Sequence, residues 1–183
     1  MDLLILGIII FFTIHLVPIS PLKNILINLL GENKYKGLFS LIALVGLLII
    51  IYGYSIADFY LIWEPLSYSR EIALVLMPIS IVLLASANMQ TNIKRFIKHP
   101  MLIGILVWSF VHLLANGDLR SIILFASFGV YALIDIMYSK KVLTTNNITN
   151  YTLTKDMIIV IIGLVAYTLI VHFHQYIAGV DIF

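Results

Sequence analysis

The stretch HPMLIGILVWSFVHLLANGD, residues 99–118, decides what kind of protein this chain is. It opens with a His-Pro pair, and proline is favoured in the first turn of a helix because the N–H group that it lacks would be unbonded there anyway. It continues as a long apolar run and ends on an Asn-Gly-Asp turn. His112 stands inside the apolar run, where hydrophobicity alone would not place an ionisable side chain.

The rest of the chain has the composition of an integral membrane protein. Of its 183 residues, 62% are hydrophobic and 11% are charged, whereas a soluble domain carries about 25% charged residues. Six apolar runs approach the roughly 20 residues that cross a bilayer, at 3–17, 38–57, 72–87, 101–115, 119–138 and 157–176. We therefore predict an all-α, polytopic bundle of six transmembrane helices that forms a single domain over residues 1–183, with the lipid bilayer as its partner.

The positive charges predict the orientation of this bundle. Nine Lys and Arg residues fall on one set of alternate loops, namely Lys23, Lys34, Lys36, Lys94, Arg95, Lys98, Lys140, Lys141 and Lys155, whereas only Arg70 and Arg120 fall on the other. Because cytoplasmic loops are rich in Lys and Arg, we expect both termini on the non-cytoplasmic side. The basic residues are dispersed in groups of three, so we expect no nucleic-acid partner.

Two segments between the apolar runs are amphipathic. Apolar residues share one helical face at Leu22, Ile25, Leu26 and Leu29, ahead of Gly31 as a stop, which predicts a short helix on the cytoplasmic interface. Between the third and fourth runs, Met89, Ile93, Phe96 and Ile97 repeat at helical spacing while Lys94, Arg95 and Lys98 face elsewhere. This pattern predicts a basic connector that rests against anionic lipid headgroups.

The histidines are the main candidates for chemistry. Trp108, His112 and Asn116 follow one another at four-residue spacing, with Ser109 beside them, and form a polar stripe that must face the protein interior. His15 shares a helical face with Phe11 and Phe12. The two phenylalanines would form an apolar wall, and the imidazole would offer one nitrogen ligand beside it. Two histidines from different helices with aromatic neighbours could hold the iron of a b-type haem.

Alternatives remain open on the residues alone. The chain has no cysteine, which excludes disulfides, thiolate-ligated haem and covalent haem attachment through cysteine. His172 is a substitute partner for His112, since it lies nearer to His112 in depth than His15 does. Alternatively, the protein is a cofactor-free scaffold whose histidines only pair helices through partners such as Ser109, Asn116, Thr168 or Tyr167.

Several motifs resemble the NnrU family of bacterial membrane proteins. They are Phe12-Thr13-Ile14-His15 in the first run, KHPMLIG at 98–104, WSFVHLLANGD at 108–118, LFASFGVYALID at 124–135 and a terminal His174 followed by Gly179 and Val180. The resemblance covers most of the chain. It implies a multi-pass protein of the bacterial inner membrane, linked to nitric oxide and nitrite metabolism in denitrification.

The NnrU family is in turn similar to 15-cis-zeta-carotene isomerase, a membrane haem b protein. If this likeness carries over, His15 and His112 match its two haem-ligating histidines, while Ser109 stands where the plant enzyme has a cysteine. The resemblance thus leaves open whether the chain is an enzyme. A haem could bind a diatomic gas, pass one electron, or act as a cis-trans isomerase on a lipophilic polyene.

Overall fold

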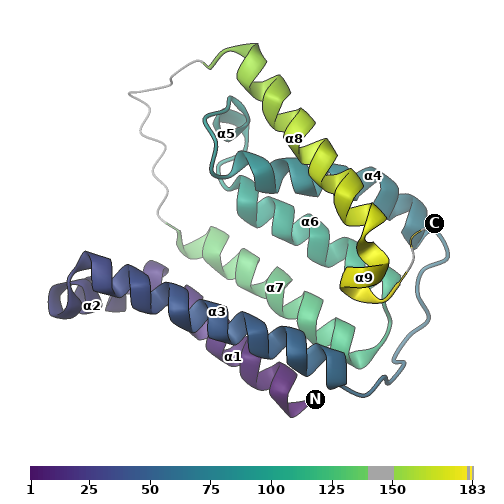
Figure 1. Cartoon of the computed structure of the whole chain (residues 1–183), viewed down its shortest axis with the longest axis horizontal. Helices are drawn as coiled ribbons and strands as arrows, with labels where there is room; N and C mark the ends of the chain where they lie inside the picture. Colours follow the sequence, from purple (N-terminus) through teal and green to yellow (C-terminus); the bar gives the residue numbers. More distant parts are fainter. Residues whose placement is uncertain (140–150, 181, 183) are drawn as a thin grey trace. The chain divides into compact units, whose positions relative to one another are not determined.

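All regular elements in the described part of the chain are helices. The computed structural model describes residues 1–139, 151–180 and 182. In chain order the helices are α1 (Asp2–Leu16), the 3-10 turn η1 (Val17–Ile19), α2 (Leu22–Leu30), α3 (Glu32–Ile56), α4 (Ser69–Ser86), α5 (Ile93–Phe96), α6 (Pro100–Ala115), α7 (Leu119–Tyr138), α8 (Leu153–His172) and α9 (His174–Ala178) (Figure 1). The predicted all-α class is thereby confirmed.

Within the described residues, five helical segments are long and apolar enough to cross a membrane. They are Asp2–Ile19, Glu32–Ile56, Ser69–Ser86, Leu119–Tyr138 and Leu153–His172. The predicted span 101–115 coincides with α6, which is apolar but only 16 residues long. At about 1.5 Å per residue, such a helix reaches roughly 24 Å, less than the ~30 Å of a hydrocarbon core.

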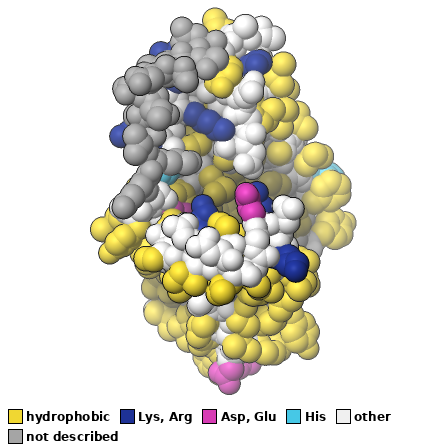
Figure 2. All heavy atoms as spheres, turned by 90° about the vertical axis from the view of Figure 1, so that its left-hand side faces the viewer, with side chains coloured by type: hydrophobic (Ala, Val, Ile, Leu, Met, Phe, Trp, Pro, Cys, Tyr) yellow, Lys and Arg dark blue, Asp and Glu magenta, His cyan; other side chains and the backbone are white. Residues whose placement is uncertain are grey.

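The apolar side chains of these helices largely face outward, as a bilayer requires. Leu48, Val75 and Val165 are more than half exposed although they lie on helices of high hydropathy. Hydrophobic side chains cover much of the face seen in Figure 2. A chain with several such helices is a multi-pass membrane protein, because water would not tolerate this surface.

The contacts divide the chain into two compact units, which we describe one at a time. The first contains residues 1–64 and 116–139, and the second contains residues 65–115 and 140–183, of which 140–150 lie outside the described residues. In the first unit α1 packs along α3 and also contacts α7, while α2 contacts α3. In the second unit α4 packs against both α6 and α8.

Glycines let α1 and α3 approach backbone to backbone. A Cβ atom added at Gly46 would lie 2.9 Å from the Phe11 nitrogen, and one at Gly7 would lie 2.6 Å from the Ile50 nitrogen. Gly53 is pressed against Leu4, which is fully buried. The sequence predicts close helix packing at Gly46 and Gly53, and this prediction is confirmed.

A short backbone clamp joins the loop after α3 to the start of α7 within the first unit. The Gly117 carbonyl accepts hydrogen bonds from the N–H groups of Ile62 at 2.8 Å and Trp63 at 3.2 Å, and the Leu119 N–H donates to the Tyr60 carbonyl at 2.8 Å. The Asp118 carboxylate caps α7 by accepting from the Ser121 N–H at 3.1 Å. The Asn-Gly-Asp turn therefore holds the loop after α3 against the start of α7.

In the second unit, small residues again set the distances between helices. The Ser80 hydroxyl of α4 donates to the Gly104 carbonyl of α6 at 2.8 Å, and a Cβ at Gly104 would lie 3.0 Å from the Ser80 carbonyl oxygen. A Cβ at Gly163 of α8 would lie 2.8 Å from the Val82 Cα. Both α6 and α8 thus rest closely on α4.

Some boundaries differ from those predicted. The predicted helix before Gly31 is confirmed as α2, and Gly31 ends it with a φ of 79°. However, α3 begins directly after Gly31, so Lys34 and Lys36 belong to its first turns rather than to a loop. The last predicted span, 157–176, is interrupted at Phe173. The predicted basic connector is helical only over Ile93–Phe96.

Candidate functional site

The His15 ring is held by its own helix. Its Nδ1 donates to the Phe11 carbonyl, four residues earlier, at 2.6 Å. Because a carbonyl only accepts hydrogen bonds, the neutral ring carries its proton on Nδ1 and its lone pair on Nε2. This is the tautomer that binds a metal through Nε2, with Nδ1 fixing the orientation of the ring.

Aromatic rings surround His15 within the first unit. The Phe11 ring stacks on the imidazole at a centroid distance of 4.1 Å, and Phe39 of α3 and Tyr131 of α7 meet it edge-on at 5.2 and 5.9 Å. Phe12 stacks on Tyr131 at 5.0 Å. The predicted group of Phe11, Phe12 and His15 therefore lies in an aromatic cluster built by three helices.

His112 has the same local geometry in the second unit. Its Nδ1 donates to the Trp108 carbonyl, again four residues earlier, at 2.8 Å. Its ring also lies 5.0 Å from the Trp108 ring. The proton is therefore on Nδ1 and the lone pair on Nε2, as in His15.

The other members of the predicted stripe are placed as follows. Ser109 is buried, with 2% of its surface exposed, and no described atom forms a hydrogen bond to its hydroxyl. Asn116 follows the last residue of α6 and belongs to the first unit. Trp108, Ser109 and His112 thus share α6, whereas His15 and Asn116 belong to the first unit.

The remaining histidines lie in different settings. His172 ends α8, is exposed, and meets the Phe173 ring edge-on at 4.9 Å. His174, the first residue of α9, donates through Nδ1 to the Val180 carbonyl at 2.8 Å. His99 precedes α6 and lines a surface cavity. None of these three has the bond to the carbonyl four residues earlier that His15 and His112 have within the described helices.

Tyr131 and Asp135 were not among the predicted site residues. The Tyr131 hydroxyl donates to one Asp135 carboxylate oxygen at 3.0 Å, and the Ser139 hydroxyl donates to the other. Tyr131 also packs against both Phe12 and His15. The four-residue spacing of Tyr131 and Asp135 on one helix was the available signal, since it brings their side chains together.

The donors suit a porphyrin better than a bare metal ion. Among the described residues, no group of three or more His, Asp or Glu side chains is close enough to hold an ion. A haem brings four nitrogen ligands of its own and needs from the protein only one or two axial ligands and an apolar wall. The Nε2 lone pair of His15 and the rings of Phe11, Phe12 and Phe39 are groups of that kind.

The fold and the composition define an α-helical, multi-pass membrane protein with histidine and aromatic side chains at its helix contacts. The sequence profile of the NnrU protein family matches residues 3–182, and the chain belongs to this family. No curated protein matches the chain, and no solved structure does so either.

Proposed function

We propose that this NnrU family protein binds haem b, and that His15 and His112 would hold its iron through Nε2. The observation that carries the proposal is the bond from each Nδ1 to the carbonyl four residues earlier, at 2.6 Å for His15 and 2.8 Å for His112. This bond fixes the tautomer and raises the basicity of the ligating nitrogen. Two histidines on different helices would thus have the same tautomer, each fixed by a bond to its own helix.

Each of the other predicted residues would have a defined part. Phe11 and Phe12 supply the apolar wall beside His15, and Trp108 supplies it beside His112. The unbonded, buried hydroxyl of Ser109 is available to a ligand group, and Asn116 could donate from its amide. When bound, a haem would supply one-electron exchange or, where a diatomic gas displaces one histidine, the binding of that gas.

The cofactor-free scaffold makes a different prediction for His15. A histidine that serves only to pair helices bonds a side chain or carbonyl of a neighbouring helix. The Nδ1 of His15 bonds a carbonyl of its own helix instead, and the Thr168 hydroxyl likewise donates within α8, to Leu164 at 2.9 Å. These contacts favour a ligand role for His15 over helix pairing.

The proposal includes the topology and the cellular role. Six helices, α6 among them, would cross a bacterial inner membrane with both termini on the non-cytoplasmic side, as the nine-to-two distribution of Lys and Arg indicates. Membership of the NnrU family favours a role in nitric oxide or nitrite metabolism over a polyene isomerase. The absence of cysteine also leaves no thiolate for ligand exchange at the iron.

An absorption spectrum of the purified full chain tests the proposal. We expect a Soret band after expression with sufficient iron, and its loss in both His15→Ala and His112→Ala. His174→Ala is the control, because His174 also bonds a carbonyl through Nδ1, but that carbonyl belongs to Val180, six residues later in the chain. Loss of the band in His172→Ala with retention in His15→Ala would instead assign the second ligand to His172.

Absence of a Soret band in the parent protein, with the helical circular dichroism of the parent intact, would refute haem binding. Retention of a normal band in either His15→Ala or His112→Ala would refute that residue as a ligand. Addition of nitric oxide to the reduced protein then tests the gas-binding role, since nitric oxide that displaces one histidine from the iron would shift the band.

A further inference from the structure

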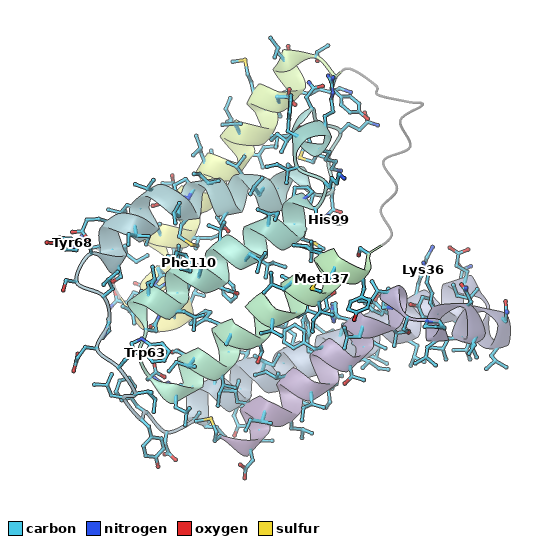
Figure 3. The ribbon with its side chains drawn as sticks, turned by 180° about the vertical axis from the view of Figure 1, so that it is seen from behind. Lys36, Trp63, Tyr68, His99, Phe110 and Met137 are labelled. Atoms are coloured by element: carbon cyan, nitrogen blue, oxygen red, sulfur yellow. The ribbon has the colours of Figure 1, made fainter. Side chains whose placement is uncertain are left out.

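The junction of α5 and α6 carries positive charge next to exposed apolar side chains. Lys94, Arg95 and Lys98 fall within five residues, and His99 follows directly. Phe96 is 83% exposed, and the Arg95 guanidinium lies 6.0 Å from its ring centroid. Figure 3 shows His99 at the start of α6, beside the α5 turn. Cationic and apolar groups therefore share one short segment.

Within the second unit, hydrogen bonds to Tyr151 and to Asp156 of α8 hold the start of this segment in place. The Asp156 carboxylate of α8 accepts hydrogen bonds from the Thr91 hydroxyl at 2.7 Å, the Asn92 N–H at 2.9 Å and the Asn92 amide at 2.7 Å. Asn92 also bonds both the N–H and the carbonyl of Tyr151. Because Asn92 is the residue before α5, these bonds fix where the basic segment starts.

A surface cavity opens at the same junction. Its volume is about 320 Å³, and it is lined by Phe96, Ile97, Lys98, His99 and Ile103. Three of these side chains are apolar, one is a cation and one is an imidazole. A cavity with such walls fits an amphiphile that has an anionic group and an apolar part, rather than a small hydrated anion alone.

We propose that this cavity binds the headgroup phosphate of an anionic membrane phospholipid. Lys98 and His99 would face the phosphate, while Phe96, Ile97 and Ile103 would contact the glycerol and the first acyl carbons. The arrangement agrees with basic segments next to membrane helices, which are attracted to anionic lipid headgroups. The proposal does not depend on haem binding, since it uses other residues.

Native mass spectrometry of the full chain in detergent tests this proposal. The probes are phosphatidylglycerol and phosphatidylcholine with identical acyl chains. We expect tighter binding of phosphatidylglycerol, and about fivefold weaker binding of it to Lys98→Gln, the loss expected for one surface charge. Lys23→Gln removes another exposed lysine, in α2, and should leave the binding unchanged.

Two further arms separate the alternatives. Phe96→Ser should weaken the binding of both lipids while it leaves the preference for phosphatidylglycerol in place. Inorganic phosphate at the lipid concentration should not displace phosphatidylglycerol; if it does, an anion without a lipid part suffices and the proposal is overturned. Equal binding of the two lipids, or equal losses in Lys98→Gln and Lys23→Gln, would also overturn it. Circular dichroism checks that each variant is folded.

Discussion

Replacing glycines of α3 with alanine tests the packing that positions His15. Gly46 faces the backbone of Phe11, and an added Cβ would stand 2.9 Å from the Phe11 nitrogen, about half an ångström inside ordinary contact. Gly37 of the same helix has open space around it. The pair Gly46→Ala and Gly37→Ala thus makes the same chemical change with and without a neighbouring helix.

The expected magnitudes follow from two opposing effects. Alanine favours a helix over glycine by roughly 0.5–1 kcal/mol, which both variants gain. Only Gly46→Ala meets the steric cost of overpacking, about 1–3 kcal/mol. A gap of half an ångström along α1 would also forfeit roughly a quarter of the dispersion attraction of the separated atoms. Gly46→Ala should therefore be less stable than Gly37→Ala by about 1–3 kcal/mol.

Unfolding of the detergent-solubilised chain by a titration with sodium dodecyl sulfate, followed by far-UV circular dichroism, measures this difference. Gly37→Ala should match or exceed the parent protein, and Gly46→Ala should unfold at a lower detergent fraction. Because Phe11 carries the carbonyl that orients His15, Gly46→Ala should also disturb the His15 ring. If the two variants unfold alike, the close contact of α1 with α3 does not exist and the reasoning fails.

Three further predictions concern other contacts. Gly117→Ala should expose the loop between α3 and α4 to limited proteolysis, because a Cβ would collide with the Trp63 carbonyl that adjoins the backbone clamp. Asp156→Asn should unfold at a lower detergent fraction in the same titration, because charge-assisted bonds to Thr91 and Asn92 are lost; Asp58→Asn, which changes an exposed carboxylate, should have no effect. Ser80→Ala should cost about 1 kcal/mol by removing the hydrogen bond to Gly104, whereas an unchanged midpoint would show that this bond adds nothing.

The helices themselves could be predicted because a bilayer enforces a simple rule. Every backbone polar group in hydrocarbon must bond within the segment, so an apolar run near 20 residues becomes a helix whatever its neighbours are. The boundaries were harder to predict. The polar residues at the start of α3 extend the helix beyond its apolar run, since Lys36 bonds Glu32 one turn earlier at 2.6 Å. A hydropathy profile does not detect ion pairs of this kind, so it places the start of the helix too late.

The neighbours of the candidate site depend on tertiary packing, which periodicity does not encode. His15 and Phe11 share a helical face, and this could be predicted from their four-residue spacing. That Tyr131 and Phe39 complete the cluster follows only from how α7 and α3 meet α1. The bond between the His15 Nδ1 and the Phe11 carbonyl depends on a rotamer, and one sequence does not specify rotamers.

The residues of the stretch 99–118 have different roles in the structure. Gly104 allows α6 to pack closely against α4, and Gly117 allows the backbone to approach the Trp63 carbonyl. Asp118 caps α7. These residues are accounted for by packing and hydrogen bonding alone. Ser109 is not, because a buried hydroxyl without a bonded partner in the described structure costs free energy in a membrane helix.

A membrane protein that needed only stability would be better served by an apolar side chain at position 109, because leucine and alanine satisfy a lipid-facing or helix-facing site without partners. The cost is offset if a ligand supplies the missing partner. His15 of α1 is an ionisable side chain set among apolar ones, and the bond from its Nδ1 to the Phe11 carbonyl leaves the Nε2 lone pair for a ligand.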